Sequence, residues 1–347
     1  MSWRRIWAMF KARNYEFFRD KAAFGWNFLF PFLIIAGFAV IFGGRDYSGF
    51  KVGVFPAAGP ASFTGSSLPP KFLATQYLEF IGFPNFAAGL EKLKHHKVDF
   101  LVRLDSPSRQ YWLLESSPKG YIVERLFQAA MIPDGPGYGE KVAVPGGGVR
   151  YLDWLFPGIL AMNMMFSALW GVGYIIVRYR KNGVLKRLRA TPLTAFEYLT
   201  AQALSRILLL MFSLVVVWLG VELLFPFRIV GSYLDVLVVF TLGATSLTSL
   251  GLLLAARGTS EEFTSGVVNF ITWPMMFLSE VWFSLEGAPR WVKTSAELLP
   301  LTPLLRAVRR VMNDGATLVE VSGDCLVLLG FTLVCLVLAA TLFSWNE

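Results

Sequence analysis

Residues 154–177 read WLFPGILAMNMMFSALWGVGYIIV, and residues 178–189 continue as RYRKNGVLKRLR. The first stretch has no charged residue and is long enough to cross the hydrocarbon core of a bilayer, which takes about 20 apolar residues in a helix. The second stretch is strongly basic and contains no acid. An apolar run followed by a basic loop is typical of a membrane helix whose basic end stays in the cytoplasm. The sequence therefore predicts an α-helical membrane protein.

The composition of the whole chain supports the same class. Of its 347 residues, 55% are hydrophobic and 16% are charged, and the mean hydropathy is +0.53. Soluble proteins carry about 25% charged residues, and their single cores stop growing near ~250–300 residues. A soluble enzyme, a disordered scaffold and a disulfide-rich secreted protein are therefore poor fits. Cys325 and Cys335 would lie roughly 15 Å apart on one helix, which is too far for a disulfide.

Six apolar segments are long enough to span a bilayer, where a helix satisfies its own backbone hydrogen bonds. Pro31, Pro157 and Pro274 fall inside three of these segments and predict kinks. The predicted spans are residues 24–42, 154–177, 198–224, 233–256, 263–283 and 325–343.

Basic residues are concentrated before the first span and between the second and third. These two segments hold twelve Lys and Arg residues against three acids, Glu16, Asp20 and Glu197. The positive-inside rule places both segments in the cytoplasm, and with six spans both chain ends lie there too. The basic residues of 290–310 would fall outside, against this rule. The net charge of +8 is explained mainly by topology, so we expect no nucleic-acid partner.

Residues 44–150, between the first two spans, have the composition of a soluble domain. The order of elements, β-α-(β)-α-β-β, predicts a small extracytoplasmic α/β domain with a mixed sheet. The following Gly- and Pro-rich residues 133–148 are expected to return flexibly to the membrane. Alternation predicts strands at 50–55, 98–104 and 110–115, and helical patterns cover 71–80, 86–95 and 118–131.

Residues 1–21 have the pattern of a basic amphipathic helix. Their apolar residues recur at helical spacing among arginines and lysines, and tryptophans are among them, so we expect the helix to lie in the membrane interface. The segment is either a passive anchor or a contact surface for a cytoplasmic partner.

The loop 178–197 has three local signals. Gly183 permits a turn, residues 184–189 then form a short basic helix, and Pro192 breaks the helical pattern. Thr194 and Glu197 have the spacing of a capping box at the start of the third span. The loop is either a simple topological signal or a short helix that transmits force from a soluble partner.

Three polar residues, Asn163, Asn269 and Glu280, are predicted at or near membrane depth. Because polar groups are costly in lipid, they either line a route through the helices or form hydrogen bonds between helices. No phosphate-binding G-x-x-x-x-G-K-[ST] loop, G-x-S-x-G element, H-E-x-x-H element or paired-cysteine zinc spacing occurs in the sequence. The adjacent His95 and His96 would diverge on a helix, so we expect no metal site there.

With these segments in place, the chain resembles the permease subunits of type-2 ABC exporters, the ABC-2 family of membrane proteins. The architecture matches, and residues 178–199 are similar to the family stretch R-x-x-G-x-L-x-R-L-x-x-T-P-L. Within residues 258–309, the stretches SEEF, WPMMFLSEVWFSLEGAPRWV and LLPLTPLLRAVR look like the family's fifth span and the short re-entrant helices after it. Many relatives have Gly in an LSG element where this chain has Glu280.

The resemblance implies how the chain is divided and what it assembles with. It implies a dimer of permeases, either a homodimer or a paralogous heterodimer, with separate cytoplasmic ATP-binding cassette subunits that hold ATP and Mg. This chain would have no cofactor and no catalytic residue of its own, and we expect it in the bacterial cytoplasmic (inner) membrane. The expected parts are an interface helix at 1–21, the first span at 22–43, the extracytoplasmic domain at 44–150, and a permease core at 151–347 that contains the coupling loop 178–197 and a re-entrant segment at 285–312.

The resemblance also implies roles for three sets of residues. Asn163, Asn269, Trp273 and Glu280 would line the translocation pathway. Trp282, Phe283, Pro289 and Trp291 would form an outer gate, although the aromatic residues among them also suit packing and interface anchoring. The residues expected to couple to the ATPase are Trp3, Ile6, Trp7, Phe10, Arg180, Lys181, Gly183, Lys186, Arg187, Arg189, Pro192, Glu197, Glu261 and Glu262.

The favoured hypothesis is an ATP-driven exporter of an amphipathic, drug-like or lipid-like substrate, because the spans are apolar and kinked. The alternative is a membrane-anchored assembly or sensory component whose extracytoplasmic domain docks a periplasmic partner, since residues 44–150 exceed what a simple channel needs. A membrane enzyme is disfavoured by the missing catalytic motifs. The sequence leaves open whether the role is efflux, lipid or polymer export, maturation or motility.

Overall fold

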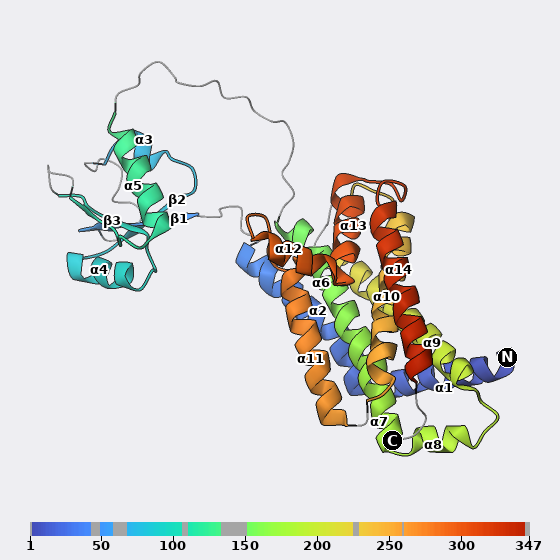
Figure 1. Ribbon diagram of the computed structural model, residues 1–347. Helices are drawn as coiled ribbons and strands as arrows, with labels where there is room; N and C mark the ends of the chain where they lie inside the picture. The colour runs from blue at the N-terminus through green and yellow to red at the C-terminus, as the bar shows by residue number, and fades with distance from the viewer. Residues whose placement is uncertain are drawn as a thin grey trace. The chain divides into compact units, whose positions relative to one another are not determined.

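The computed structural model describes residues 2–42, 49–57, 68–105, 110–132, 151–224, 229–258 and 260–343. The chain divides into two compact units (Figure 1). One unit is Gly44–Gly146, and the other joins Met1–Gly43 to Gly147–Glu347. Each unit has its own clusters of buried apolar side chains. The predicted Gly- and Pro-rich return at 133–148 lies outside the described residues.

The smaller unit contains a four-stranded mixed sheet in the order β2-β1-β3-β4. Strand β1 pairs in parallel with β2 and β3, and β4 runs antiparallel to β3. Aromatic side chains from the sheet and helices, among them Phe72, Phe100 and Phe127, are fully buried together. The elements are β1 (Phe50–Phe55), α3 (Pro70–Leu73), β2 (Leu78–Gly82), α4 (Phe86–Lys94), β3 (Phe100–Arg103), β4 (Tyr111–Trp112) and α5 (Pro118–Ala130).

The helix expected at residues 71–80 is wrong. Only α3 is helical there, and residues 78–82 form β2, which pairs with β1 from Phe50 to Val54. Tyr77 separates the two with a positive φ of 69°, which a continuous helix does not allow. The apolar residues of β2 gain more from pairing in the sheet than from extending a short helix, and this pairing is not visible in local periodicity. The other strands and helices of this unit occur near the expected positions, with shorter third and fourth strands.

The larger unit is entirely helical in the part that the structure describes. Its prolines at 31, 157 and 274 lie within helices that continue on both sides. The elements are α1 (Trp3–Arg19), α2 (Lys21–Phe42), α6 (Tyr151–Ala168), the π-helix η2 (Leu169–Tyr174), α7 (Ile175–Lys181), α8 (Val184–Arg189), α9 (Ala195–Leu224), α10 (Tyr233–Ala255), α11 (Glu261–Leu278), α12 (Arg290–Glu297), α13 (Leu301–Asp314) and α14 (Ser322–Leu342).

Four helical segments among the described residues are long and apolar enough to cross a membrane. They are Tyr151–Lys181, Ala195–Leu224, Tyr233–Ala255 and Ser322–Leu342. Helices α1 and α2 form a pair bent by 61°, which adds a fifth if the pair is one broken span. Helix α11, the predicted fifth span, begins with two glutamates and ends at Leu278, five residues before the predicted end. The six-span topology therefore stays a prediction.

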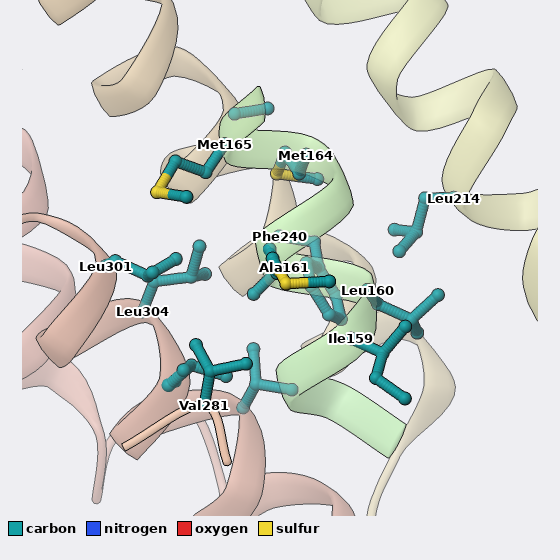
Figure 2. Close-up of a cluster of buried hydrophobic side chains, with 14 of the residues drawn as sticks. Ile159, Leu160, Ala161, Met164, Met165, Leu214, Phe240, Val281, Leu301 and Leu304 are labelled. Carbon is teal, nitrogen blue, oxygen red and sulfur yellow. The ribbon is translucent and has the colours of Figure 1, made fainter. Parts of the chain in front are cut away.

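Helix α10 lies inside the helical unit and contacts α6, η2, α9, α13 and α14 (Figure 1). Its backbone approaches η2 closely: a Cβ atom on Gly173 would lie 3.3 Å from the carbonyl oxygen of Gly251. Close backbone approach through small residues is how membrane helices gain packing energy without a hydrophobic drive between them. Figure 2 shows the adjoining core, in which α6 side chains such as Met165 meet Phe240 of α10 and Leu304 of α13.

Candidate functional site

The basic loop and the start of α1 are joined through Glu197. The capping box expected from the sequence is present, because Glu197 N donates to Thr194 Oγ1 (3.2 Å) and Thr194 N donates to Glu197 Oε2 (3.0 Å). The other carboxylate oxygen, Oε1, accepts from Ser2 N at 2.6 Å. Arg5 lies 3.5 Å from Oε2 and also donates to the carbonyl of Pro192. Glu197 is almost fully buried. One carboxylate thus ties together the N-terminal helix, the loop and α9.

Arg180 ties the same loop to the end of α10. Its buried guanidinium donates to the carbonyls of Ala255 (3.0 Å) and Ala256 (3.2 Å), and also to that of Gly258. A cation at the C-terminal end of a helix satisfies carbonyls that have no partner in the helix and offsets the helix dipole. Arg180 therefore positions the loop from within the protein.

The turn between α10 and α11 is held by further contacts to α7 and η2. Lys181 lies 3.7 Å from Glu261 and 3.4 Å from Glu262, and Tyr174 donates to Glu261 at 2.7 Å. The hydroxyl of Ser260, together with Lys181, lowers the pKa of Glu262 to about 2. The contacts between loop and turn are thus charged at neutral pH.

Most predicted coupling residues are either buried or exposed, whereas Phe10, Gly183 and Glu261 are half-buried. Ile6, Arg180 and Glu197 are buried and make contacts inside the chain. Gly183 has a φ of 68°, which lets α8 turn away from α7 as expected. Side chains that face outward, and so could meet a partner, are Trp3, Trp7, Lys186, Arg187, Arg189 and Pro192.

The π-helix η2 carries two buried arginines from other helices. Arg13 of α1 donates to the carbonyl of Gly171 at 2.9 Å, to Tyr179 Oη at 2.8 Å and to Glu16 at 2.7 Å. Arg206 of α9 lies directly over Gly171, where an added Cβ would come within 2.0 Å of its Cζ atom. A π-helical insertion in a helix often marks a functional position. Here the insertion and its glycine make room for both guanidinium groups.

A polar network continues from Arg206 into the helices. Arg206 donates to Ser167 Oγ, and Ser167 in turn donates to Asn27 Oδ1 at 3.0 Å. Asn27 donates to Ser213 Oγ at 2.7 Å, and its backbone carbonyl accepts from Asn163 at 3.4 Å. The network links α2, α6 and α9 at depths where the sequence is otherwise apolar.

Two pockets meet at this network. The first has a volume of about 580 Å³ and is mainly apolar, and the second has about 320 Å³ and a larger share of polar groups in its lining. Asn27, Ser167 and Trp170 line both, so the pockets are neighbours. The first is lined also by Trp26, Phe30, Met162, Asn163, Phe166, Trp273, Met276 and Trp282, and the second by Arg13, Glu16, Phe17, Asp20, Gly171, Tyr174, Ile175, Arg178, Ser205, Arg206 and Leu209.

Glu280 lies at the other end of α11, in a different pocket. It has a φ of 59°, and Val281 N donates to the carbonyl of Met276, which is the bond pattern of a helix C-terminus that favours glycine. Its side chain accepts from Leu285 N at 2.7 Å. Arg309 donates to its backbone carbonyl at 2.7 Å and stacks 3.7 Å above the ring of Trp154. These residues line a pocket of about 330 Å³ between α11, α12 and α13.

The structure brings only part of the predicted pathway and gate together. Asn163, Trp273 and Trp282 line the apolar pocket, whereas Glu280 lines the pocket next to α12 and Asn269 is exposed on α11. The remaining gate residues lie apart from the apolar pocket: Phe283 stacks on Phe277, Pro289 precedes α12 and Trp291 is exposed.

A sequence model described as "ABC-2 type transporter" matches residues 116–313, more than half of the chain. This chain belongs to the ABC-2 type transporter family. Members of this family are transport components rather than enzymes, and the long apolar helices of this chain indicate a multi-pass membrane protein.

Two curated relatives are named as resistance permeases. The linearmycin resistance permease protein LnrN of Bacillus subtilis (strain 168) is 23% identical over 177 residues, which cover 51% of this chain and 46% of LnrN. The daunorubicin resistance ABC transporter permease protein DrrB1 of Streptomyces coeruleorubidus is 24% identical over 171 residues, which cover 48% of this chain and 59% of DrrB1. The match spans about half the length of these curated relatives.

Sequence reasoning missed the arginines over η2 and the role of Asn27. The signal was available, since a charged residue inside an apolar run, such as Arg206, marks a functional position in membrane proteins by default. The π-helix left no sign in the periodicity of residues 169–174.

Proposed function

We propose that this chain is the permease subunit of an ATP-driven exporter that moves an amphipathic, drug-like or lipid-like substrate outward, using ATP hydrolysed by a separate cytoplasmic subunit. Family membership supports transport, and the relatives' names support efflux of antibiotic-like compounds. The observation that carries the proposal is the apolar pocket between α2, α6 and α11. Its volume of about 580 Å³ is in the range that holds drug-sized ligands, ~300–1,000 Å³.

The lining of this pocket suits an amphipathic substrate. Trp26, Trp170, Trp273 and Trp282 give broad apolar surfaces, while the amides of Asn27 and Asn163 provide a few fixed polar contacts. A predominantly apolar lining with few polar groups is typical of ligand sites. A strongly charged polymer would lose its hydration in such a pocket without gaining partners.

Coupling to the ATP-binding subunit is proposed to pass through α8 and α1. The exposed basic side chains of α8 provide the contact, and the buried bonds of Arg180 and Glu197 make α8, α1 and the α10–α11 turn move as one piece. Because Glu197 lies in the first turn of α9 and η2 adjoins α7, displacement of α8 would reach the helices that line the pocket.

Reconstitution of the full permease with its co-purifying ATP-binding subunit tests this function. We expect ATP-dependent loss of an amphipathic drug from the membrane and ATP hydrolysis that the drug stimulates. In the variants Gly183→Ala and Glu197→Gln, stimulated hydrolysis should fall about tenfold, because the first strains the turn and the second removes a buried charge from a shared contact. Arg4→Gln, an exposed change on α1, is the matched control.

Two outcomes would contradict the proposal. Drug movement that is independent of ATP and of the second subunit would exclude an ATP-driven exporter. Unchanged stimulation in both loop variants would exclude the proposed relay.

A further inference from the structure

The apolar and the polar pocket form one chamber with two chemically different ends. They share Asn27, Ser167 and Trp170. The apolar end is walled by tryptophan, phenylalanine and methionine, and the polar end has the guanidinium groups of Arg13, Arg178 and Arg206 in its lining. A ligand that fills the chamber must therefore be apolar at one end and polar at the other.

Of the two buried arginines in this chamber, Arg13 is paired with Glu16, and Arg206 has no acidic partner among the described residues. Arg206 is more than nine-tenths buried. Among the residues that the structure describes, its Nε has no hydrogen-bond partner, and its guanidinium donates to the neutral hydroxyl of Ser167. Within the described part of the chain it forms no ion pair, and its charged neighbour is a second cation, Arg13. A buried charge without a counter-charge is costly, and an anion placed against it recovers much of that cost.

The charged residues that line the polar end, Arg206 included, carry a net charge of plus one. Three arginines face two acids there, Glu16 and Asp20. Glu16 is engaged by Arg13 at 2.7 Å, and Asp20 ends α1, where its backbone carbonyl accepts from Phe24 N at 2.9 Å. A single anionic group beside Arg206 would make the lining neutral.

We propose that this chamber binds an anionic amphiphile, with its acidic headgroup at Arg206 and its apolar body among the tryptophans. The inference rests on the proposed function, because it names the substrate class of that exporter. Gly171 is the specificity-determining backbone position, since a side chain there would displace the guanidinium. The shared chemistry is a carboxylate or phosphate on an apolar body, whether the source is a membrane lipid or a free compound.

Quenching of tryptophan fluorescence tests the proposal on the full-length permease in nanodiscs of phosphatidylcholine. The probes are a bromine-tipped alkanoate, the matching alkyl phosphate and the matching alkyl-trimethylammonium, whose bromine quenches the tryptophans of the chamber. We expect the wild-type protein to be half-quenched at about tenfold lower concentration of either anionic probe than of the cation. Adding phosphatidylglycerol to the nanodiscs weakens anionic-probe binding if membrane lipid uses the site, and leaves it unchanged if free compounds do.

The variants separate headgroup recognition from packing. In Arg206→Gln and in Gly171→Ala the preference for anions should fall to nearly none, although the second retains the arginine. Arg206→Lys should keep part of the preference, and Arg4→Gln, an exposed arginine on α1, should keep all of it. If Arg206→Gln or Gly171→Ala does not fold, the preference for the anionic probes is measured instead on the wild-type protein at rising salt concentration, where it should be lost.

The outcomes distinguish this inference from the proposed function. No anion preference in the wild type, or an unchanged preference in Arg206→Gln, overturns the inference even if ATP-driven export of a neutral or cationic drug is observed. Anion binding at Arg206 without any ATP-dependent movement supports the inference on the binding site and overturns the exporter.

Discussion

Glu280, two residues after the end of α11, adopts a left-handed backbone conformation that residues other than glycine rarely take. Two hydrogen bonds offset the strain of this conformation: the Glu280 carboxylate accepts from Leu285 N, and the Glu280 backbone carbonyl accepts from Arg309. The second contact is made by the backbone and would survive any side-chain change. A glycine would therefore fit the same helix end, and the glutamate adds a bond to the next turn at the expense of backbone strain.

A pair of variants separates these two effects. Glu280→Ala loses the side-chain bond and keeps the strain, whereas Glu280→Gly loses the bond and removes the strain. We expect the glycine variant to be more stable than the alanine variant by about 1 kcal/mol, the usual penalty for a Cβ atom in this conformation. Thermal unfolding of the purified protein, followed by tryptophan fluorescence, measures the difference. Equal stability of the two variants would contradict strain at this residue.

Single residues show where prediction from the sequence succeeds. The capping box of Thr194 and Glu197 and the turn at Gly183 were predictable, because each depends on neighbours within a few positions. Arg206 over Gly171 was not, since it requires α9 to cross η2 at one glycine. Local signals therefore predicted the loop, and inter-helix contacts, which no local pattern encodes, determined the chamber.

At the scale of elements, most apolar runs became helices near their expected bounds, because about 20 apolar residues leave few alternatives in lipid. The exceptions depend on partners. Residues 78–82 became a strand because β1 pairs with them, and α11 stopped at Leu278 because its end is capped by contacts from α13. The short helices α12 and α13 were expected as a re-entrant segment, and their depth in a membrane stays a prediction.

Helix α11 also presents a stripe of exposed aromatic side chains, Phe263, Phe270 and Phe277, spaced seven residues apart. We propose that a second permease copy covers this stripe, which would bring the exposed Asn269 to the route between the copies.

Phe270→Cys in a variant lacking Cys325 and Cys335 should then cross-link to a dimer under mild oxidation in native membranes. Leu333→Cys, exposed on α14, is the matched control. Cross-linking at 333 but not at 270 would place the dimer contact elsewhere.

At the scale of the whole molecule, the two units have separate cores, and the chamber is lined by the helical unit alone. Replacing residues 49–132 by a short Gly/Ser linker should therefore leave drug binding and drug-stimulated ATP hydrolysis within about twofold of the wild type, because long surface segments can be removed at a small entropic cost. Binding is measured by tryptophan quenching, and hydrolysis is measured in the reconstituted complex.

A periplasmic partner that is captured by the full-length chain and lost with the α/β unit would assign that unit to docking. Loss of transport in a variant that still binds drug would instead make the unit part of the export step, since substrate entry would then be intact and release would fail.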